Sequence, residues 1–522
     1  MPRKIRLIIL VVLPALMLYM AWPPRWLWFL GLIAFVPWLQ LEKETSNRKG
    51  FFWLLYVGML LFNLSNTWWV WYASPAGSIF MLLANSALMC LPFVAYRYIK
   101  KSFSTTKALF AFVCLWLAFE YLHLNWEITW PWLSLGNVFA KYPNVVQWYE
   151  FTGMLGGSLW VLVSNVLLFM FLEKKARKYL VLSSLNIGIP LIISSIVLLR
   201  LDSKEAIIKA ATYEAVIVQP NVDPYVKFDR GKEVQTLKAM LALSELQVGE
   251  QTDYVIFPET AVVEYVDEDE MESFESIALL KNYVKRHPNV HLITGLSSYN
   301  FYDPGEKRKP TVRTTSFGDE YESYNTALEV SPNGESDLYH KSKLVPGVEK
   351  MPYPKIFGFL EKLSLNMGGV TGSLGADSEP SVFDAGDKPN LAPLICYESV
   401  FPGFVAGFVQ KGANIILVMT NDGWWRDTDG YKQHMHYARL RAIENRMQVL
   451  RSANTGISCH INEKGEILER TSWWEEDVLK VNVRALESKT FFSTHGDYIG
   501  RFGSFFGIFL LIGAFVKRKV KH

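Results

Sequence analysis

Long apolar runs dominate the first 200 residues of the chain. A helix that crosses a bilayer needs about 20 mostly apolar residues. Seven runs before residue 201 fit this requirement and an eighth lies near the end, at roughly 5–22, 26–41, 51–72, 78–96, 107–121, 155–172, 179–199 and 499–516. The first run follows MPRKIR and has no small-residue cleavage site, so a signal peptide is disfavoured. The pattern predicts a multi-span α-helical membrane domain.

After residue 213 the pattern changes to short β-rich runs that end in turn or polar residues. These runs lie at 215–222, 253–260, 291–298, 325–334, 390–399 and 414–423. Helical patterns at 234–247, 271–287 and 431–447 lie between several of them. Alternating strands and helices predict a layered α/β domain. We therefore expect a membrane domain over 1–200, an extramembrane domain over 201–490, and a last helix with a basic tail over 491–522.

The composition supports a membrane protein and excludes several other classes. The chain has 522 residues, is 50% hydrophobic and contains 18 Trp, which is too apolar for an ordinary soluble protein of this size. The net charge of +3 is small and does not favour nucleic-acid binding. The four cysteines form no CxxC pair, so the sequence predicts neither a zinc site nor a disulfide framework. We expect no metal and no cofactor.

Basic residues occur in alternate connections between the apolar runs. Such loops face the cytoplasm in membrane proteins. The pattern therefore predicts that both termini are cytoplasmic and that residues 200–498 lie on the opposite side of the membrane. The residues concerned are Arg3, Lys4, Arg6, Lys43, Arg48, Lys49, Arg97, Lys100, Lys101, Lys107, Lys174, Lys175, Arg177, Lys178, Lys517, Arg518, Lys519 and Lys521.

Tryptophans cluster at the other, less basic connections. Trp residues are enriched at membrane–water interfaces. We interpret two groups as an outer aromatic belt, with anchoring favoured over substrate contact: Trp68, Trp69 and Trp71, and Trp126, Trp130 and Trp132.

Three predicted strands end in residues that carry chemistry: Glu259, Cys396 and the pair Asn421–Asp422. In α/β folds, functional residues gather at the carboxyl ends of strands. A cysteine that attacks a carbonyl needs a base, and the resulting oxyanion needs fixed positive charge or N–H donors. A carboxylate fits the first need and a lysine the second.

The stretches FPET with Glu259, YHKSKLVP with Lys341 and ICYES with Cys396 resemble the three signature motifs of the nitrilase (carbon–nitrogen hydrolase) superfamily. They occur in the family's order, 82 and 55 residues apart, and ARLRAIENR and SANTG are similar to later family segments. The resemblance implies an αββα sandwich. It also implies that Cys396 is the nucleophile, Glu259 the general base and Lys341 the oxyanion holder, with the Tyr397 N–H as second donor.

Membrane spans around such a domain resemble the apolipoprotein N-acyltransferase family. PWLSLGN (131–137), LVPGVEKMPY (344–353) and NDGWW (421–425) are similar to further segments of that family. The resemblance implies that Glu349 orients Lys341 or Glu259. The family usually has Pro-Phe-Gly-Glu where this chain has Pro346-Gly347-Val348-Glu349, so the contacts of this loop are expected to differ. Among the other matched residues, Trp424 is expected to support function, and Tyr397 and Glu398 are expected to shape the pocket.

The resemblance implies acyl transfer in a bacterial inner membrane, with a periplasmic catalytic domain. A phospholipid would acylate the cysteine, and the α-amine of a diacylglyceryl-cysteine apolipoprotein would take the acyl group. The partners are therefore two lipid substrates and the bilayer, and we expect a monomer. One or both of the apolar segments at 401–410 and 353–370 are predicted to form a mobile lid that touches the membrane, with ordinary core helices as the alternative.

Other interpretations remain open at this point. A membrane-tethered amidase would transfer its acyl group to water, and a transporter or sensor would need ionisable residues within its spans. Cys396 as a buried thiol or as half of a disulfide with Cys459 is a further alternative. Structural roles are the alternatives for Glu349, Glu398 and Trp424. Lys343 is interpreted as a surface or membrane-facing charge, and no metal-ligand pattern is assigned to His434 or His436.

Overall fold

The computed structural model describes the chain except residues 204–210, 226, 228–230, 358–372, 488 and 521–522. The described residues form two compact units. The first unit comprises residues 1–71, 75–201 and 495–522. The second comprises 72–74 and 202–494, so it is inserted into the first along the chain. The two units are described separately below.

Seven helices of the described residues are long and apolar enough to cross a membrane. Six precede residue 202 and the last ends near the C-terminus: α1 (Arg3–Ala21), α3 (Arg48–Thr67), α5 (Pro75–Ile99), α6 (Thr105–Asn125), α7 (Tyr149–Lys174), α8 (Arg177–Leu201) and α17 (Tyr498–Lys519). The prediction of a continuous span over 26–41 is wrong. That region holds a 3-10 segment, Trp28–Leu32, and the nine-residue helix α2 (Val36–Glu44), which starts anew around Pro37.

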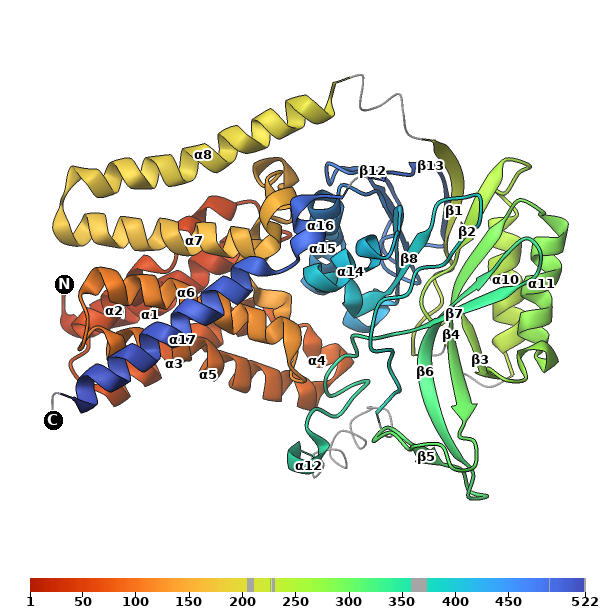
Figure 1. Cartoon of the computed structure of the whole chain (residues 1–522), viewed down its shortest axis with the longest axis horizontal. Helices are drawn as coiled ribbons and strands as arrows, with labels where there is room; N and C mark the ends of the chain where they lie inside the picture. The colour runs from red at the N-terminus through yellow and green to blue at the C-terminus, as the bar shows by residue number, and fades with distance from the viewer. Residues whose placement is uncertain (204–210, 226, 228–230, 358–372, 488, 521–522) are drawn as a thin grey trace. The chain divides into compact units, whose positions relative to one another are not determined.

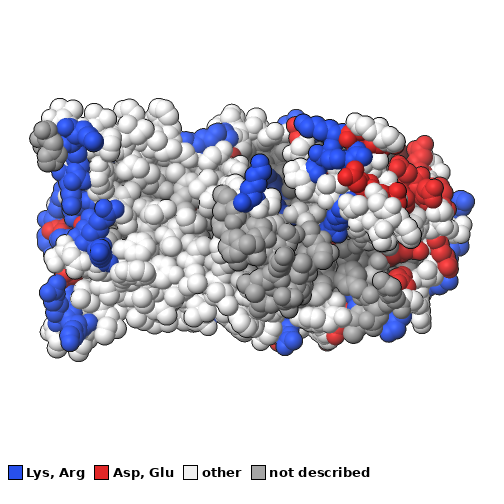
Figure 2. Space-filling model, turned by 90° about the horizontal axis from the view of Figure 1, so that it is seen from below, with Lys and Arg blue, Asp and Glu red and all other residues white. Residues whose placement is uncertain are grey.

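The basic ends of these helices lie together in the first unit. Arg6 in α1 pairs with Glu44 at the end of α2 at 2.6 Å, and Lys100 after α5 pairs with Glu42 at 2.7 Å. The Arg518 guanidinium of α17 lies 4.7 Å from the centre of the Tyr98 ring. Figure 2 shows Lys and Arg gathered at this end, beside a broad uncharged surface. The chain therefore runs away from the basic end along α1 and has returned to this end at Glu44. The returning chain consists of two short segments, Trp28–Leu32 and α2, instead of one continuous helix.

The PWLSLGN stretch forms 3-10 turns, Pro131–Leu133 and Leu135–Phe139, that are buried inside the first unit. Glu120 in α6 accepts hydrogen bonds from the Leu135 N–H at 2.9 Å and from Trp116 Nε1 at 2.8 Å. The backbone groups of such an irregular segment need partners within the protein. Glu120 supplies one of them, which gives this ionisable residue a structural role.

The two predicted tryptophan groups meet in this unit. The ring centroids of Trp69 and Trp132 are 5.0 Å apart, and both side chains are buried. The belt interpretation is therefore wrong for these two residues, whereas Trp68 and Trp71 remain exposed.

Helix α17 packs closely on α6 through glycines. A Cβ at Gly500 would lie 2.6 Å from Tyr121 Cδ2, and one at Gly503 would lie 2.7 Å from Leu117 Cβ. Small residues let membrane helices approach closely. The last helix is thereby fixed to the middle of the first unit.

The second unit contains two β-sheets of the described residues. The first has the order β13–β1–β2–β4–β6–β5, with β3 paired to β4 and β7 paired to β6. Its strands are β1 (Thr212–Gln219), β2 (Thr252–Ile256), β3 (Val262–Asp267), β4 (His291–Phe301), β5 (Arg313–Thr314), β6 (Glu320–Val330), β7 (Ser336–His340) and β13 (Asp477–Arg484). The second has the order β12–β11–β10–β9–β8, with bounds β8 (Leu391–Ile395), β9 (Ile415–Thr420), β10 (Val449–Ala453), β11 (Cys459–Ile461) and β12 (Ile467–Arg470).

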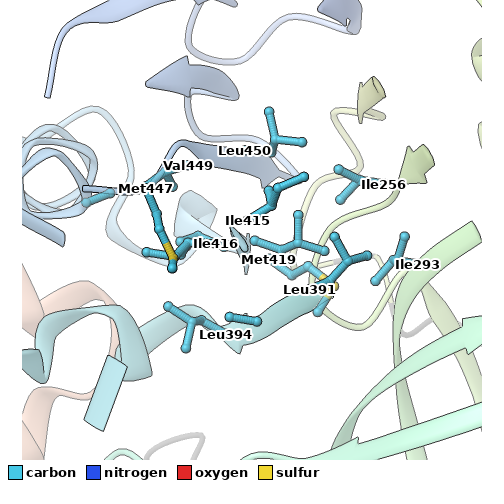
Figure 3. Packing of buried hydrophobic residues seen from close by; sticks show 14 of the residues in the cluster. Ile256, Ile293, Leu391, Leu394, Ile415, Ile416, Met419, Met447, Val449 and Leu450 are labelled. Carbon is cyan, nitrogen blue, oxygen red and sulfur yellow. The ribbon is translucent and has the colours of Figure 1, made fainter. Parts of the chain in front are cut away.

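Apolar side chains from the two sheets form one core. Figure 3 shows Ile256 and Ile293 of the first sheet near Leu391 and Met419 of the second. Helices α14 (Pro402–Gln410) and α15 (Asp429–Asn445) pack on the second sheet and add their own side chains to this core. A separate cluster joins the first sheet to α10 (Glu233–Ser244) and α11 (Glu275–Arg286) (Figure 1). The layers are helix, sheet, sheet and helix, so the predicted αββα sandwich is confirmed.

Candidate active site

Cys396 directly follows the buried strand β8 and begins a 3-10 turn, Cys396–Val400. Its φ of 49° lies in the left-handed region, which is unfavourable for a residue with a side chain. Strain of this kind is found at functional sites that the surrounding structure holds in place. Cys396 is partly exposed, while Cys90, Cys114 and Cys459 are buried, and all four are free. A Cys396–Cys459 disulfide is therefore excluded.

Glu259 lies in the loop after β2, in contact with β4. A Cβ at Gly295 would lie 2.4 Å from Thr260 N and 2.7 Å from Glu259 Cα, so only glycine leaves room for this loop. The Glu259 carboxylate accepts hydrogen bonds from Asn325 Nδ2 at 2.9 Å and from the Asn421 N–H at 3.0 Å. These contacts fix the carboxylate in a buried position.

The side chain of Lys227 donates hydrogen bonds to the same loop. Its Nζ donates to the Glu259 carbonyl oxygen at 2.9 Å and to Thr260 Oγ1 at 3.0 Å. Thr260 has a φ of 48°, so the turn after Glu259 is also strained. Burial lowers the pKa of Lys227 to about 7. No local sequence pattern indicates this role for Lys227, because it lies 32 positions before Glu259.

Lys341 follows β7 directly and is buried between two carboxylates. Its Nζ lies 2.7 Å from Glu349 Oε1 and 3.2 Å from Glu259 Oε1. Burial acts to lower the pKa of Lys341, but the carboxylates of Glu349 and Glu259 outweigh it and hold the pKa above its usual value. Asn325 Nδ2 also donates to Glu349 at 3.3 Å, so one amide and one ammonium bridge the two acids. The ammonium remains charged at neutral pH.

The charges of Glu259 and Lys341 act on the thiol of Cys396. Burial and the Glu259 charge raise the pKa of Cys396 well above its usual value, and Lys341 opposes this increase. A neutral thiol is a weak nucleophile, so the reaction needs a base that takes the proton as the sulfur attacks. The charges of Glu259 and Lys341 thus act on Cys396, although the three residues are 82 and 55 positions apart in the sequence.

Glu398 is fully buried and connects the cysteine turn with the lysine loop. One oxygen accepts from the Ser342 N–H at 2.7 Å and from the Tyr339 hydroxyl at 2.6 Å. The other accepts from the Ile395 N–H at 2.8 Å. Burial raises the pKa of Glu398 to about 7, against the effect of these hydrogen bonds. Its contacts within the protein favour the structural alternative for this residue.

Three further residues lie around the pocket. Tyr397 is buried against Phe401, with ring centroids 5.0 Å apart. Trp424, in the turn Asp422–Trp425, is partly exposed and packs edge-on against Tyr225 at 5.4 Å. Lys343 is partly buried, with its Nζ 5.1 Å from the centre of the Phe404 ring, and burial lowers its pKa. Lys343 thus packs on an aromatic ring and stays partly exposed, and its interpretation as a membrane-facing charge stays a prediction.

No role is predicted for His434 from the sequence, yet its ring lies beside Cys396. Ligand-type atoms of Cys396, Asp422 and His434 all lie within 4.8 Å of one another. Asp422 also pairs with the Arg451 guanidinium, so a metal cation would have to displace an existing positive charge. The group therefore fits an ion pair better than a metal site.

The predicted lid segments have different outcomes. Residues 402–410 form α14, whose Val405, Phe408 and Val409 belong to the core. The core alternative therefore holds for this segment, and the lid prediction is left to the other segment alone. Most of 353–370 lies outside the described residues.

Known proteins resemble this chain over both units. Residues 215–489 match the family described as carbon–nitrogen hydrolase, and residues 14–167 match the apolipoprotein N-acyltransferase N-terminal domain. The apolipoprotein N-acyltransferase of Chlorobaculum tepidum is 34% identical over 92% of this chain and 90% of its own length. That of Geobacter metallireducens is 27% identical over 94% and 91%. A carbon–nitrogen hydrolase structure from Helicobacter pylori G27 covers 56% of this chain and 92% of its own, with 17% identity and a TM-score of 0.37.

The second unit is thus a carbon–nitrogen hydrolase domain of the nitrilase superfamily, here joined to membrane-spanning helices. The two matched regions, together with the relative from Chlorobaculum tepidum, define the family more closely. The chain belongs to the apolipoprotein N-acyltransferase family and is an acyltransferase.

Proposed function

We propose that this enzyme moves a fatty acyl chain from a membrane phospholipid to the α-amine of the diacylglyceryl-cysteine of apolipoproteins. The names of the relatives support the acceptor class. The observation that carries the mechanism is the buried ion group in which Glu259 and Glu349 share the Lys341 ammonium. The charges of Glu259 and Lys341 act on the Cys396 thiol, which supports the roles of base, cation and nucleophile for these three residues.

In the first half-reaction, Cys396 Sγ attacks the carbonyl carbon of a phospholipid ester. Glu259 takes the thiol proton as the S–C bond forms. Lys341 and the Tyr397 backbone N–H stabilise the oxyanion. The ester C–O bond then breaks, and Glu259 returns the proton to the departing lysophospholipid oxygen. The product on the enzyme is a thioester at Cys396.

In the second half-reaction, the neutral α-amine of the apolipoprotein attacks the thioester carbonyl. The same oxyanion site stabilises the tetrahedral intermediate. Glu259 accepts a proton from the amine, and the C–S bond breaks. The proton passes to the sulfur, so the products are an amide on the lipoprotein and the resting thiol. The two substrates thus react in turn at one cysteine, which is ping-pong catalysis.

We further propose that the enzyme is a monomer of the bacterial inner membrane, with both termini cytoplasmic and the catalytic unit periplasmic. The shared basic end of the first unit supports this orientation, because basic loops face the cytoplasm. Both substrates carry acyl chains, and exposing a chain to water costs about 0.8 kcal/mol per CH₂. A membrane-embedded enzyme avoids most of that cost.

Intact-protein mass spectrometry tests this function. Purified enzyme incubated with phospholipid should gain one fatty-acyl mass, and Cys396→Ala should gain none. Adding a diacylated lipopeptide should then remove the adduct and yield N-acyl peptide. Release of free fatty acid without N-acyl peptide would instead indicate the amidase alternative. An adduct on Cys396→Ala would disprove the assignment of the nucleophile.

A further inference from the structure

A cluster of buried polar side chains lies beside the backbone of Cys396 and has no part in the proposed proton transfers. It consists of Ser399, Asp422, His434 and Arg451, whose residues are all fully buried. They come from the cysteine turn, the loop after β9, helix α15 and strand β10. Four polar side chains from four elements are costly to bury unless their hydrogen bonds are satisfied. Their contacts therefore indicate what the group holds in place.

One side of the group holds the carbonyl oxygen of Cys396 itself. His434 Nε2 lies 3.2 Å from this oxygen, and Ser399 Oγ donates to it at 2.8 Å. His434 Nε2 also lies 2.9 Å from Ser399 Oγ. The carbonyl of the strained, left-handed residue is thus held by two side chains.

The other side of the group fixes the imidazole ring. His434 Nδ1 lies 3.0 Å from Asp422 Oδ1 and 3.2 Å from Arg451 Nη2. Thr420 Oγ1 donates to Asp422 at 2.7 Å, and Arg451 Nη2 pairs with the same carboxylate. Burial acts to raise the pKa of Asp422, but Arg451 and His434 outweigh it and hold the pKa below its usual value. Asp422 is therefore ionised.

These contacts place a proton on His434 Nε2 in either charge state of the ring. The Cys396 carbonyl oxygen can only accept, so its contact needs hydrogen on Nε2. A neutral ring with that tautomer accepts at Nδ1 from Arg451. A charged ring donates at Nδ1 to Asp422 instead. In both forms the bond to Cys396 is kept.

We propose that His434, held by Asp422 and Arg451, is a positioning residue that keeps the Cys396 turn in its attacking geometry through the Cys396 carbonyl oxygen. The inference rests on the proposed role of Cys396 as nucleophile. His434 does not transfer the thiol proton here; Glu259 keeps that role. The requirement is one N–H at the Nε2 position, aimed at that carbonyl.

Two variants of His434 separate this role from simple packing. In His434→Gln the side-chain amide nitrogen reaches the Nε2 position, whereas in His434→Asn it reaches only the Nδ1 position. A misplaced nucleophile costs about 100-fold in rate. We expect His434→Asn to slow formation of the Cys396 acyl adduct by about 100-fold and His434→Gln by less than tenfold. The KM for phospholipid should stay unchanged in both.

His436→Asn, on the same helix, is the matched control and should acylate at the wild-type rate. The inference is overturned if His434→Asn and His434→Gln acylate equally fast at comparable thermal stability. If His434→Asn does not fold, Ser399→Ala tests the same carbonyl by removing its other donor. About a tenfold slower acylation is then expected, and an unchanged rate contradicts the inference. A wild-type enzyme that forms no adduct would instead contradict the proposed function.

Discussion

The Glu398 carboxylate accepts a hydrogen bond from the backbone N–H of Ser342 at 2.7 Å, although the two residues are 56 positions apart. Glu398 stands two residues after the nucleophile, and Ser342 directly follows Lys341. The contact therefore sets the spacing between the thiol and the ammonium. A residue that resembles a pocket acid in sequence instead connects two catalytic loops.

Replacing Glu398 by Gln should weaken this connection. One oxygen would become an NH₂ group facing backbone N–H donors, and a buried unsatisfied donor costs about 1–3 kcal/mol. We expect a lower melting temperature and an acylation rate reduced by about 10-fold or more. Glu329→Gln removes a buried carboxylate that pairs with His291 and should lower stability alone. Equal acylation rates for the two variants would contradict the role of Glu398.

Lys341→Met should abolish most activity. It removes the ammonium that Glu259 and Glu349 share and leaves two buried carboxylates without their cation. Loss of one oxyanion donor costs about 10²–10³ in rate. Lys343→Met, two residues away, should retain acylation within about threefold, because Lys343 lies over phenylalanine rings. Rates of adduct formation by mass spectrometry provide the comparison, and a fast Lys341→Met enzyme would exclude Lys341 from the oxyanion site.

Gly295→Ala should displace the base. The new methyl group would lie 2.4 Å from Thr260 N, so the loop that carries Glu259 must shift. We expect acylation to fall by about 100-fold. Gly249→Ala is the control, since its methyl group meets nothing closer than 3.6 Å. A Gly295→Ala enzyme with normal acylation would show that the position of Glu259 is not critical.

His340 should make stability depend on pH. Burial acts to lower the pKa of His340, but Asp377 and Glu268 outweigh it and raise the pKa to about 9 from an ordinary 6.5. A raised pKa means that the stabilisation is fully present below pH 6.5 and is lost as pH rises through about 9. It amounts to at most about 3 kcal/mol.

Thermal unfolding of wild type and His340→Gln at pH 6 and pH 9.5 tests this prediction. The difference between the two melting temperatures should be largest at pH 6 and smaller at pH 9.5. The ring also stacks on Tyr324 at 3.9 Å, and that contact should not depend on pH. A difference that stays constant with pH would therefore assign the contribution of His340 to stacking.

The sequence predicted the parts of the fold that depend on local pattern. Short apolar runs before polar residues marked β2, β8 and β9, and the chemistry at their ends marked Glu259 and Cys396. The hydropathy pattern wrongly predicted one continuous span over 26–41. Hydropathy depends on the number of apolar residues and does not show that the helix is interrupted and starts again near Pro37. It also cannot tell an inward tryptophan from an outward one, which explains the error for Trp69 and Trp132.

Contacts between distant segments were beyond the sequence patterns. His434 lies 38 residues after Cys396 on a helix, and nothing near it in the chain indicates its ring contacts. Lys227 and Asn325 likewise contact the Glu259 loop from distant positions in the chain. The residues proposed to react were found from motifs, whereas most of the residues that contact them were not.

The chain leaves the first unit after Leu201 and rejoins it at His495, and α17 then packs on α6 through Gly500 and Gly503. A single proteolytic nick in the inserted unit would therefore release neither fragment from the bilayer, since each piece keeps at least one hydrophobic helix. Co-expressing the two halves as separate polypeptides offers a route to a reassembled enzyme, with the glycine-lined helix pair as its docking point.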